Sequence, residues 1–255
     1  MATAPKQHLM TDGLILREYE TVAEADRFVA ILTRDKGLLR ASARGAKRVK
    51  SRAGAATQPL CYARLSLIPA RDKYIIEDAQ PQEVFFPLRQ DVEKLALAQY
   101  FCELALRLCP TDAAAPNHLR LLLNGLHYLS SGQKPPLQVK AVVEGRLLSL
   151  EGYMPDLVGC CQCGRQEGDL WFSPTAGTLF CAAHSGQTDL SQAVAVSGGV
   201  LAALRHILYG DFERCFAFSL PAADTADLAT LMERFLLAQL QRSFKTLDFY
   251  HSLRS

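Results

Sequence analysis

Two pairs of potential metal ligands constrain the fold of this 255-residue chain more than any other feature. Within each pair, two residues separate the ligands, a spacing that lets both side chains reach one ion. Residues 164–180 separate the pairs, which is the spacer length typical of a tetrahedral zinc site built from two knuckles. Three thiolates and one imidazole would fill all four positions, so the ion would be structural rather than catalytic. The sequence therefore predicts one structural Zn²⁺ ion per chain, and its predicted ligands are Cys160, Cys163, Cys181 and His184.

The remaining cysteines are not predicted to bind this ion. Cys161 has only Cys163 as a partner, at a spacing too short for a knuckle. The others occur singly among apolar neighbours, where a reduced cysteine behaves as a small buried hydrophobic residue; they are Cys61, Cys102, Cys109 and Cys215. The alternative to a metal site is a cluster of reduced thiols in a loop. The segment is too polar to pack a core of its own, which favours the metal site.

Short segments rich in strand-forming residues alternate with turn signals within residues 1–80. They cover residues 14–17, 27–33, 38–43, 60–68 and 74–77. Residues 34–37 are typical of a hairpin turn, in which Gly37 is free to adopt a positive φ. Five short strands in a small domain favour a closed or partly open β-barrel, because closure removes exposed strand edges. An OB-fold is the commonest barrel of this kind, although the number of strands alone does not select it.

Helical spacing of apolar residues replaces the strand pattern after Pro81. The segments with this spacing are 91–108, 118–129, 137–150, 199–209 and 227–240. Their apolar stripes are expected to form a core, and no chemistry is assigned to them. The segment that holds the clustered cysteines interrupts the helical pattern. The predicted architecture is therefore multi-domain α+β, with a barrel at 1–80, a helical domain at 81–155 and 190–255, and a zinc finger at 156–189 inserted into the helical domain.

Positive charge is concentrated near the N-terminus, although the formal net charge of the whole chain is only +2. Within residues 34–52, Asp35 is the only acid among many cations. A basic strand followed by a basic loop is a layout that neutralises nucleic-acid phosphates. The alternative is a solvated, charged surface loop. The candidate phosphate-binding residues are Arg34, Lys36, Arg40, Arg44, Lys47, Arg48, Lys50 and Arg52. The aromatic residues available either for base stacking or for the core are Tyr19, Phe28, Tyr62 and Tyr74.

No motif of nucleotide hydrolysis or metal-assisted catalysis occurs in the sequence. Lys50 and Ser51 resemble the end of a phosphate-binding loop, but Val49 stands where that motif requires glycine. The signatures G-x-G-x-x-G, H-E-x-x-H and G-x-S-x-G are also missing. No catalytic residue is assigned, and we expect a protein that is not an enzyme. Because the chain shows neither a signal-peptide pattern nor a sufficiently long apolar run, we also expect a cytoplasmic protein without a membrane partner.

The order of several short motifs along the chain resembles that of the bacterial RecO recombination-mediator proteins. The N-terminal motifs are Gly13-Leu-Ile-Leu, Ile31-Leu-Thr33-Arg, Gly45-Ala-Lys-Arg and Gln58-Pro59-Leu60. The later motifs are Pro155-Asp-Leu, the knuckle from Cys160 to Gly164, Phe172-Ser-Pro and Cys181. Their order and spacing over most of the chain carry the resemblance. The family often has cysteine at the last zinc position, where this chain has His184, and zinc accepts either ligand.

The resemblance implies an N-terminal OB-fold, followed by a helical domain with an inserted zinc finger. It further implies a non-enzymatic mediator of DNA repair and recombination that binds single- and double-stranded DNA and anneals complementary strands without ATP. RecR would be a partner, and together they would help RecA to replace single-strand-binding protein on gapped DNA, in the cytoplasm at the nucleoid. The cations of residues 34–52 are then the candidate DNA-binding residues.

Two other classes of function are consistent with the same motifs. OB barrels and zinc knuckles also occur in RNA-binding modules of translation and RNA processing. A competition between single-stranded DNA and RNA of equal length would separate that function from DNA binding. An enzyme with an undetected site would cleave labelled DNA or release phosphate in the presence of Mg²⁺, and we expect neither.

Overall fold

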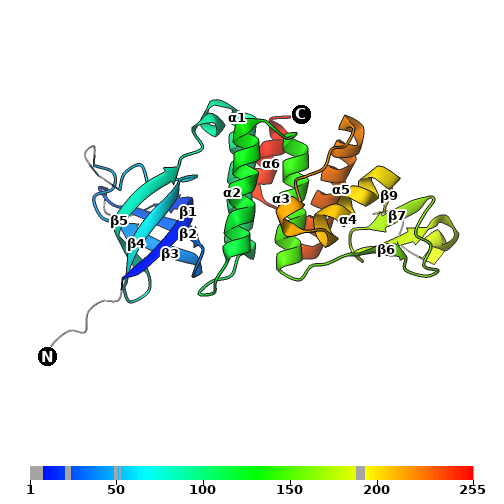
Figure 1. Cartoon of the computed structure of the whole chain (residues 1–255), viewed down its shortest axis with the longest axis horizontal. Helices are drawn as coiled ribbons and strands as arrows, with labels where there is room; N and C mark the ends of the chain where they lie inside the picture. Colours follow the sequence, from blue (N-terminus) through cyan, green and yellow to red (C-terminus); the bar gives the residue numbers. More distant parts are fainter. Residues whose placement is uncertain (1–7, 21–23, 49–50, 52, 188–192, 255) are drawn as a thin grey trace. The chain divides into compact units, whose positions relative to one another are not determined.

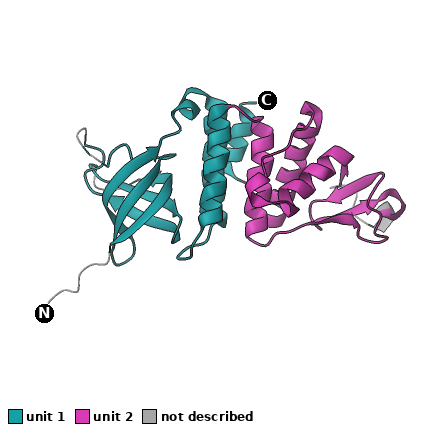
Figure 2. Ribbon diagram, viewed as in Figure 1, with its two compact units in different colours: residues 1–131, 244–255 teal, residues 132–243 magenta. Residues whose placement is uncertain are grey.

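The computed structural model describes residues 8–20, 24–48, 51, 53–187 and 193–254. Backbone contacts divide the chain into two compact units, which Figure 2 shows in two colours. Unit 1 consists of residues 1–131 and 244–255, and unit 2 consists of residues 132–243. The sequence-based domain boundaries at 80/81, 155/156 and 189/190 describe a different division and stay a prediction.

Unit 1 begins with a closed five-stranded barrel (Figure 1). Its strands are β1 (Leu9–Tyr19), β2 (Arg27–Thr33), β3 (Gly37–Ala43), β4 (Tyr62–Pro69) and β5 (Tyr74–Glu83). Their order around the barrel is β1-β2-β3-β5-β4, and β4 pairs again with β1. The β3–β5 pair is parallel, and the other pairs are antiparallel. The predicted OB-like barrel is confirmed, and inward-facing side chains such as Val29, Ile31 and Leu65 form its apolar core.

A β-bulge in β1 decides which of its side chains reach the outer surface of the barrel. The register between β1 and β2 runs from Ile15↔Ile31 to Arg17↔Ala30, so Leu16 is the extra residue. Ile15 faces the core. Without the bulge Arg17 would face the core as well, because side chains two residues apart on a strand share a face. The bulge turns Arg17 outward instead.

Helices complete unit 1 after the barrel. They are η1 (Phe86–Gln90, a 3₁₀ turn), α1 (Val92–Leu108), α2 (Pro116–Ser131) and α6 (Lys245–Ser252). The Asp91 side chain accepts hydrogen bonds from the backbone N–H groups of Glu93 and Lys94 and so caps α1. α1 packs against α6, where the rings of Tyr100 and Phe244 meet edge-on with centroids 5.9 Å apart. Both α1 and α2 also contact β1, which joins the barrel to these helices.

The connection between α1 and α2 is hydrogen-bonded to the β2–β3 hairpin. The Leu38 N–H donates to the Pro110 carbonyl at 2.8 Å, and the Ala115 N–H donates to the Arg34 carbonyl at 2.9 Å. Gly37 lies between these contacts with a φ of 61°, as the turn pattern predicts. A Cβ atom at Gly37 would lie 2.1 Å from the Pro110 carbonyl oxygen, so the close approach of the two segments requires glycine.

Unit 2 combines a helical body with a small sheet (Figure 1). Its helices are α3 (Pro136–Leu150), α4 (Gly198–Tyr209) and α5 (Ala222–Leu240), and its 3₁₀ turns include η2 (Ala182–Gln187) and η4 (Phe212–Arg214). The strands are β6 (Asp156–Cys160), β7 (Leu170–Ser173), β8 (Thr178–Cys181) and β9 (Val194–Val196), in the order β6-β8-β7-β9. The sheet lies in the chain between α3 and α4, where the sequence predicts the inserted finger.

The sequence-based segments and the observed elements differ mainly at their ends. The first predicted strand, 14–17, is part of a longer strand that starts at Leu9. α6 has no counterpart among the predicted helices, because eight residues are too few for a clear apolar stripe. Within the described part of the chain, no helix is both long enough and apolar enough to cross a membrane.

We predict that Gly37→Ala destabilises the barrel far more than Gly45→Ala. Both glycines have a positive φ, 61° and 62°. At Gly45 the nearest atom to an added Cβ belongs to the Arg48 side chain, at 3.5 Å, whereas Gly37 faces fixed backbone. We expect a loss of about 3 kcal/mol in the free energy of unfolding for Gly37→Ala and about 1 kcal/mol for Gly45→Ala, measured by urea denaturation. Equal losses would show that the contact with the Pro110 carbonyl is unimportant.

Candidate nucleic-acid interface and metal centre

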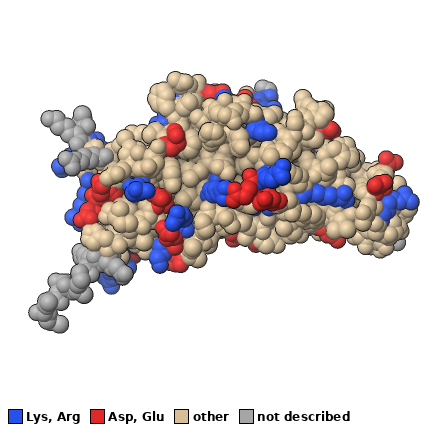
Figure 3. Space-filling model, viewed as in Figure 1, with Lys and Arg blue, Asp and Glu red and all other residues tan. Residues whose placement is uncertain are grey.

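Charge on the surface of the barrel is mixed rather than uniformly positive. On the face shown in Figure 3, Lys and Arg side chains of the barrel are interspersed with Asp and Glu. Several charged side chains of the barrel form ion pairs, such as Lys47 with Glu18 at 2.9 Å and Arg64 with Asp12 at 3.3 Å. A binding site for a polyanion therefore requires cations that are not neutralised in this way.

An open cleft of about 650 Å³ lies on the outer face of the barrel. Its floor is a row of register partners on three neighbouring strands: Arg17 of β1, Ala30 of β2 and Arg40 of β3. Register partners lie on the same face of a sheet, so the two arginines flank the methyl group of Ala30. Because alanine is small, the row is hollow at its centre.

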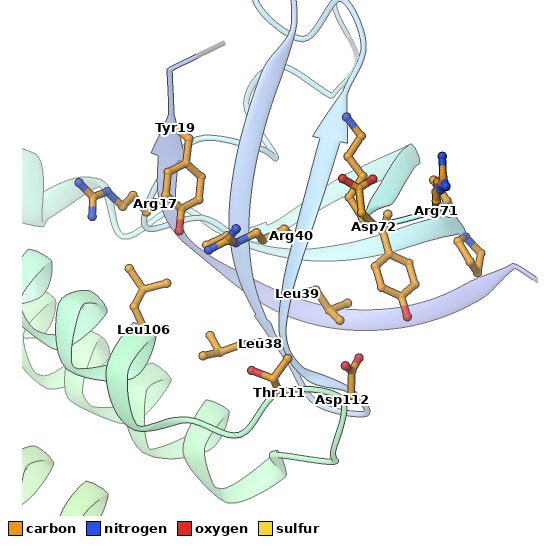
Figure 4. Close-up of a pocket in the computed structure, with 15 residues that line it drawn as sticks. Arg17, Tyr19, Leu38, Leu39, Arg40, Arg71, Asp72, Leu106, Thr111 and Asp112 are labelled. Carbon is orange, nitrogen blue, oxygen red and sulfur yellow. The ribbon is translucent and has the colours of Figure 1, made fainter.

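The β4–β5 turn and the segment at the end of α1 form the walls of the cleft. The turn contributes Pro69–Tyr74, and the other wall contributes Leu106, Thr111 and Asp112. Figure 4 shows Arg17, Tyr19 and Arg40 together at one end of the cleft, with Arg71 and Asp72 at the other. Strands β2 and β3 and the β4–β5 loop are the parts of an OB-fold that bind oligonucleotides.

Cations and aromatic rings alternate across this face. The guanidinium carbons of Arg17 and Arg40 lie 5.6 Å and 5.7 Å from the centroid of the Tyr19 ring. Phe28 is the register partner of Tyr19, and their ring centroids lie 5.6 Å apart. The Lys73 Nζ lies 5.5 Å from the Phe28 centroid. Such contacts contribute about 0.5–1 kcal/mol at exposed sites, and they hold the cations in place without neutralising them.

The cations of the cleft are free of ion pairs with any carboxylate of the described residues. Asp72 and Asp112 line the same cleft but form no such pair with them. These cations are Arg17, Arg40, Arg71 and Lys73. The cleft thus offers positive charge together with an aromatic surface, which is the combination that binds single-stranded nucleic acids.

The structure places the predicted cations of residues 34–52, the basic segment, in different surroundings. Arg40 lines the cleft. Two others are paired with carboxylates, Arg34 with Asp35 at 3.5 Å and Lys47 with Glu18 at 2.9 Å. The remaining ones are the exposed Lys36, Arg44 and Arg48, together with Lys50 and Arg52, which lie outside the described residues. The role of these residues in DNA binding stays a prediction.

The sequence-based interpretation misses the cleft cations Arg17, Arg71 and Lys73. Strand alternation places Arg17 on the core side of β1, and only the bulge reverses this. Arg71 and Lys73 flank Asp72, so the turn is not conspicuously basic in the sequence. The signal that identifies them is their position in the β4–β5 loop of an OB-like barrel.

The four predicted metal ligands come together in unit 2, with their ligand atoms within 4.8 Å of one another. The Sγ atoms of Cys163 and Cys181 are 3.8 Å apart, and the His184 Nδ1 lies 3.7 Å from the Cys160 Sγ and 3.3 Å from the Cys181 Sγ. A tetrahedral Zn²⁺ site, with Zn–S about 2.3 Å and Zn–N about 2.0 Å, holds its ligand atoms about 3.5–3.8 Å apart. The group therefore fits one four-coordinate ion. The exposed Cys161 does not belong to it.

Local backbone geometry brings the four ligands together. Cys160 ends β6 and Cys181 ends the neighbouring strand β8, and His184 follows in η2. Gly164 has a φ of 73°, and its N–H donates to the Cys160 carbonyl at 2.8 Å. This bond closes the first knuckle with a tight turn, for which the positive φ of glycine is suited.

Hydrogen bonds favour the thiolate form of two of the ligands, Cys160 and Cys181. Burial raises the pKa of the Cys160 thiol, but the backbone N–H groups of Gln162, Cys163 and Cys181 donate to its sulfur and hold the pKa at about 6. A hydrogen bond from His184 lowers the pKa of the Cys181 thiol. Because the thiolate is the form that binds metals, the donor set suits a divalent cation.

Helix α4 holds the outer edge of β6. The Arg205 guanidinium donates to the Leu157 carbonyl at 2.8 Å and to the Val158 carbonyl at 3.0 Å. The Tyr209 hydroxyl donates to the Pro155 carbonyl and accepts from the Leu157 N–H, both at 2.7 Å. These bonds satisfy backbone groups that no strand covers, and they anchor the ligand-bearing sheet to the helices of unit 2.

Comparisons with known proteins cover both parts of the chain. The family model described as Recombination protein O N terminal matches residues 7–85, and the model described as Recombination protein O C terminal matches residues 89–248. Proteins named DNA repair protein RecO from Acetivibrio thermocellus and Symbiobacterium thermophilum are each 31% identical to this chain, over 96% of it and 97% of the relative. One from Desulforudis audaxviator is 33% identical, over 95% of the chain and 96% of the relative. The chain therefore belongs to the RecO family of DNA repair proteins.

Proposed function

We propose that this chain is a recombination mediator that binds single- and double-stranded DNA without strict sequence preference and anneals complementary strands without ATP. The observation that carries the proposal is the cleft on the OB-like barrel, which is lined by four cations without an ion pair among the described residues, two of them against the Tyr19 ring. Barrels of this kind bind oligonucleotides on the same face. Membership of a DNA repair family favours DNA over RNA as the ligand.

Charge neutralisation is the physical basis of the proposed annealing. Two complementary strands repel each other through their phosphates. A surface that contacts both backbones replaces their counterions and reduces this repulsion. Base pairing itself supplies the free energy, so the reaction needs neither a nucleotide cofactor nor a catalytic residue. We therefore also propose that the protein is not an enzyme.

The proposed partners are other proteins of recombination. We propose that the chain acts with RecR, and that the two promote loading of RecA onto DNA covered by single-strand-binding protein, in the cytoplasm at the nucleoid. Support for these partners comes from membership of the RecO family.

The metal proposed for the Cys₃His group is Zn²⁺, one ion per chain. Thiolates and imidazole are ligands that zinc favours, and four protein ligands leave no open position for a substrate. The ion would therefore be structural. It would hold together a segment with little core of its own, since residues 161–169 are all exposed.

We predict that neutralising the two floor arginines halves the salt dependence of single-strand binding. If the four cleft cations each contact one phosphate, log K falls against log salt with a slope of about −2.8, at roughly 0.7 per contact. The double variant Arg17→Gln/Arg40→Gln is expected to have a slope of about −1.4 and to bind all sequences about tenfold or more weakly. Fluorescence anisotropy of labelled oligonucleotides at several salt concentrations measures both quantities.

The matched control is the double variant Arg34→Gln/Lys47→Gln, which removes the same charge from two cations paired with carboxylates. Its expected loss of affinity is less than about threefold, because a carboxylate beside each cation offsets part of its attraction for a phosphate. Equal losses in both double variants, or a wild-type slope near zero, would contradict the assignment of the cleft.

We predict that removing the metal opens the small sheet of unit 2. Trp171, the one tryptophan of the chain, lies on β7 and stacks on Phe180 with ring centroids 6.3 Å apart. Its fluorescence therefore reports on this sheet. Cys181→Ser is expected to lose the bound ion and to shift the Trp171 emission to longer wavelength, because structural metal sites contribute directly to local folding.

The Cys161→Ser variant is the control for this experiment. It changes an exposed thiol outside the group, so it is expected to keep one ion per chain and the native emission. Elemental analysis of the purified chains measures the metal content. The four-ligand assignment would be contradicted if wild-type protein contained no zinc and its Trp171 emission did not change when Zn²⁺ was added.

A further inference from the structure

Tyr19 occupies a position that phosphate binding alone does not require. Its ring lies between the guanidinium groups of Arg17 and Arg40 (Figure 4). On β1, Tyr19 lies two residues after Arg17, whose register partner Ala30 leaves the hollow. Phe28 packs against it, and the ring is only partly buried, so part of its surface faces the cleft. A partly exposed ring that is supported by Phe28 and covered only by mobile cations is suited to stacking once those cations turn to phosphates.

We propose that the cleft holds one unpaired nucleotide, whose base stacks on Tyr19 over the Ala30 hollow and whose neighbouring phosphates bind Arg17 and Arg40. The inference rests on the proposed function of DNA binding. It adds a contact to the base, and this contact distinguishes single strands from duplexes, which the phosphate contacts alone do not.

The size and chemistry of the cleft support this ligand. A volume of about 650 Å³ falls within the range of about 300–1,000 Å³ typical of pockets for small organic groups. Every base has a π face, so stacking on a tyrosine tolerates all sequences. In a duplex both faces of a base are covered by its neighbours. A paired base therefore reaches Tyr19 only after it leaves the stack, which is costly.

Phosphate binding and base stacking would be coupled through the two arginines. In the free protein their guanidinium groups lie against the Tyr19 ring. A phosphate forms charge-assisted hydrogen bonds with a guanidinium group, and these are stronger than a cation–π contact at an exposed site. Binding of the backbone would draw the two cations away from the ring and free its face for the base.

The same contact has a consequence for annealing. Once a bound base pairs with its complement, it leaves Tyr19, and the cleft keeps only its phosphate contacts. The annealed product is then held less tightly than the single strands, so stacking on Tyr19 favours release of the duplex.

The test compares Tyr19→Leu with Tyr19→Phe in the full chain, using a single strand of oligothymidylate that carries one 2-aminopurine and a duplex of equal length. Tyr19→Leu removes the π face and is expected to weaken single-strand binding about 5- to 150-fold, the contribution of stacking one base, with less than about a twofold change for the duplex. Tyr19→Phe keeps the ring and is expected to bind like the wild type. The 2-aminopurine emission is expected to fall on binding in every variant except Tyr19→Leu.

Other outcomes separate this inference from the proposed function. If Tyr19→Leu weakens single strands and duplexes equally, Tyr19 only positions the arginines, and the stacking proposal is wrong. If Tyr19→Leu changes neither, the base lies elsewhere, and the proposal is also wrong. In both cases, a loss of affinity in the double variant Arg17→Gln/Arg40→Gln would still support the proposal that the cleft binds DNA. Tyr153→Leu changes an exposed tyrosine of unit 2 and is the control for an unspecific effect.

A second measurement on the wild type covers the case in which Tyr19→Leu fails to fold. An oligonucleotide with 5-iododeoxyuridine crosslinks under ultraviolet light to an aromatic side chain against which its base is stacked. Mass spectrometry of the digested complex is expected to find the crosslink at Tyr19. A crosslink confined to peptides that do not contain Tyr19 would overturn the proposal.

Discussion

The register of β1, β2 and β3 is the constraint on which the candidate interface depends. One extra residue, Leu16, shifts the pairing of β1 and moves Arg17 from the core side of the barrel to its outer face. Register then aligns Arg17 with Ala30 and Arg40, and the small alanine leaves room between the two cations. A strand without the bulge would direct Arg17 into an apolar core and would leave no cleft of this charge.

A chain with almost no net charge can still present a polyanion site, because its cations are divided into two groups. Some, such as Arg34 and Lys47, lie beside carboxylates that offset part of their charge. Arg17 and Arg40 of the cleft lie against the Tyr19 ring instead, and a ring holds a cation without cancelling its charge. The distribution of partners, rather than the number of cations, determines where a phosphate backbone would bind.

The sequence predicts the features of this protein that depend on local spacing. The five strands, most of the helices and the knuckle ending at Gly164 follow from periods and spacings of a few residues, and the structure contains them. The ion pair between Lys47 and Glu18 joins residues far apart in the chain, so no local pattern reveals that Lys47 has a carboxylate partner. The sequence does not predict the bulge at Leu16 either, because the residues around it have the pattern of an ordinary strand. Sequence patterns therefore select residues 34–52 as a candidate binding site and do not indicate Arg17 or the β4–β5 turn.

We propose that nucleic acid binds the cleft rather than residues 34–52 as a whole. The most direct test is a titration of the ¹⁵N-labelled chain with a short oligothymidylate, followed through the Nε–Hε resonances of arginine in NMR spectra. Binding in the cleft is expected to give large shifts for Arg17, Arg40 and Arg71 at the lowest DNA concentrations, and small shifts for Arg34. Shifts confined to Arg34 and Arg44, with Arg17 and Arg40 unchanged at saturation, would contradict it.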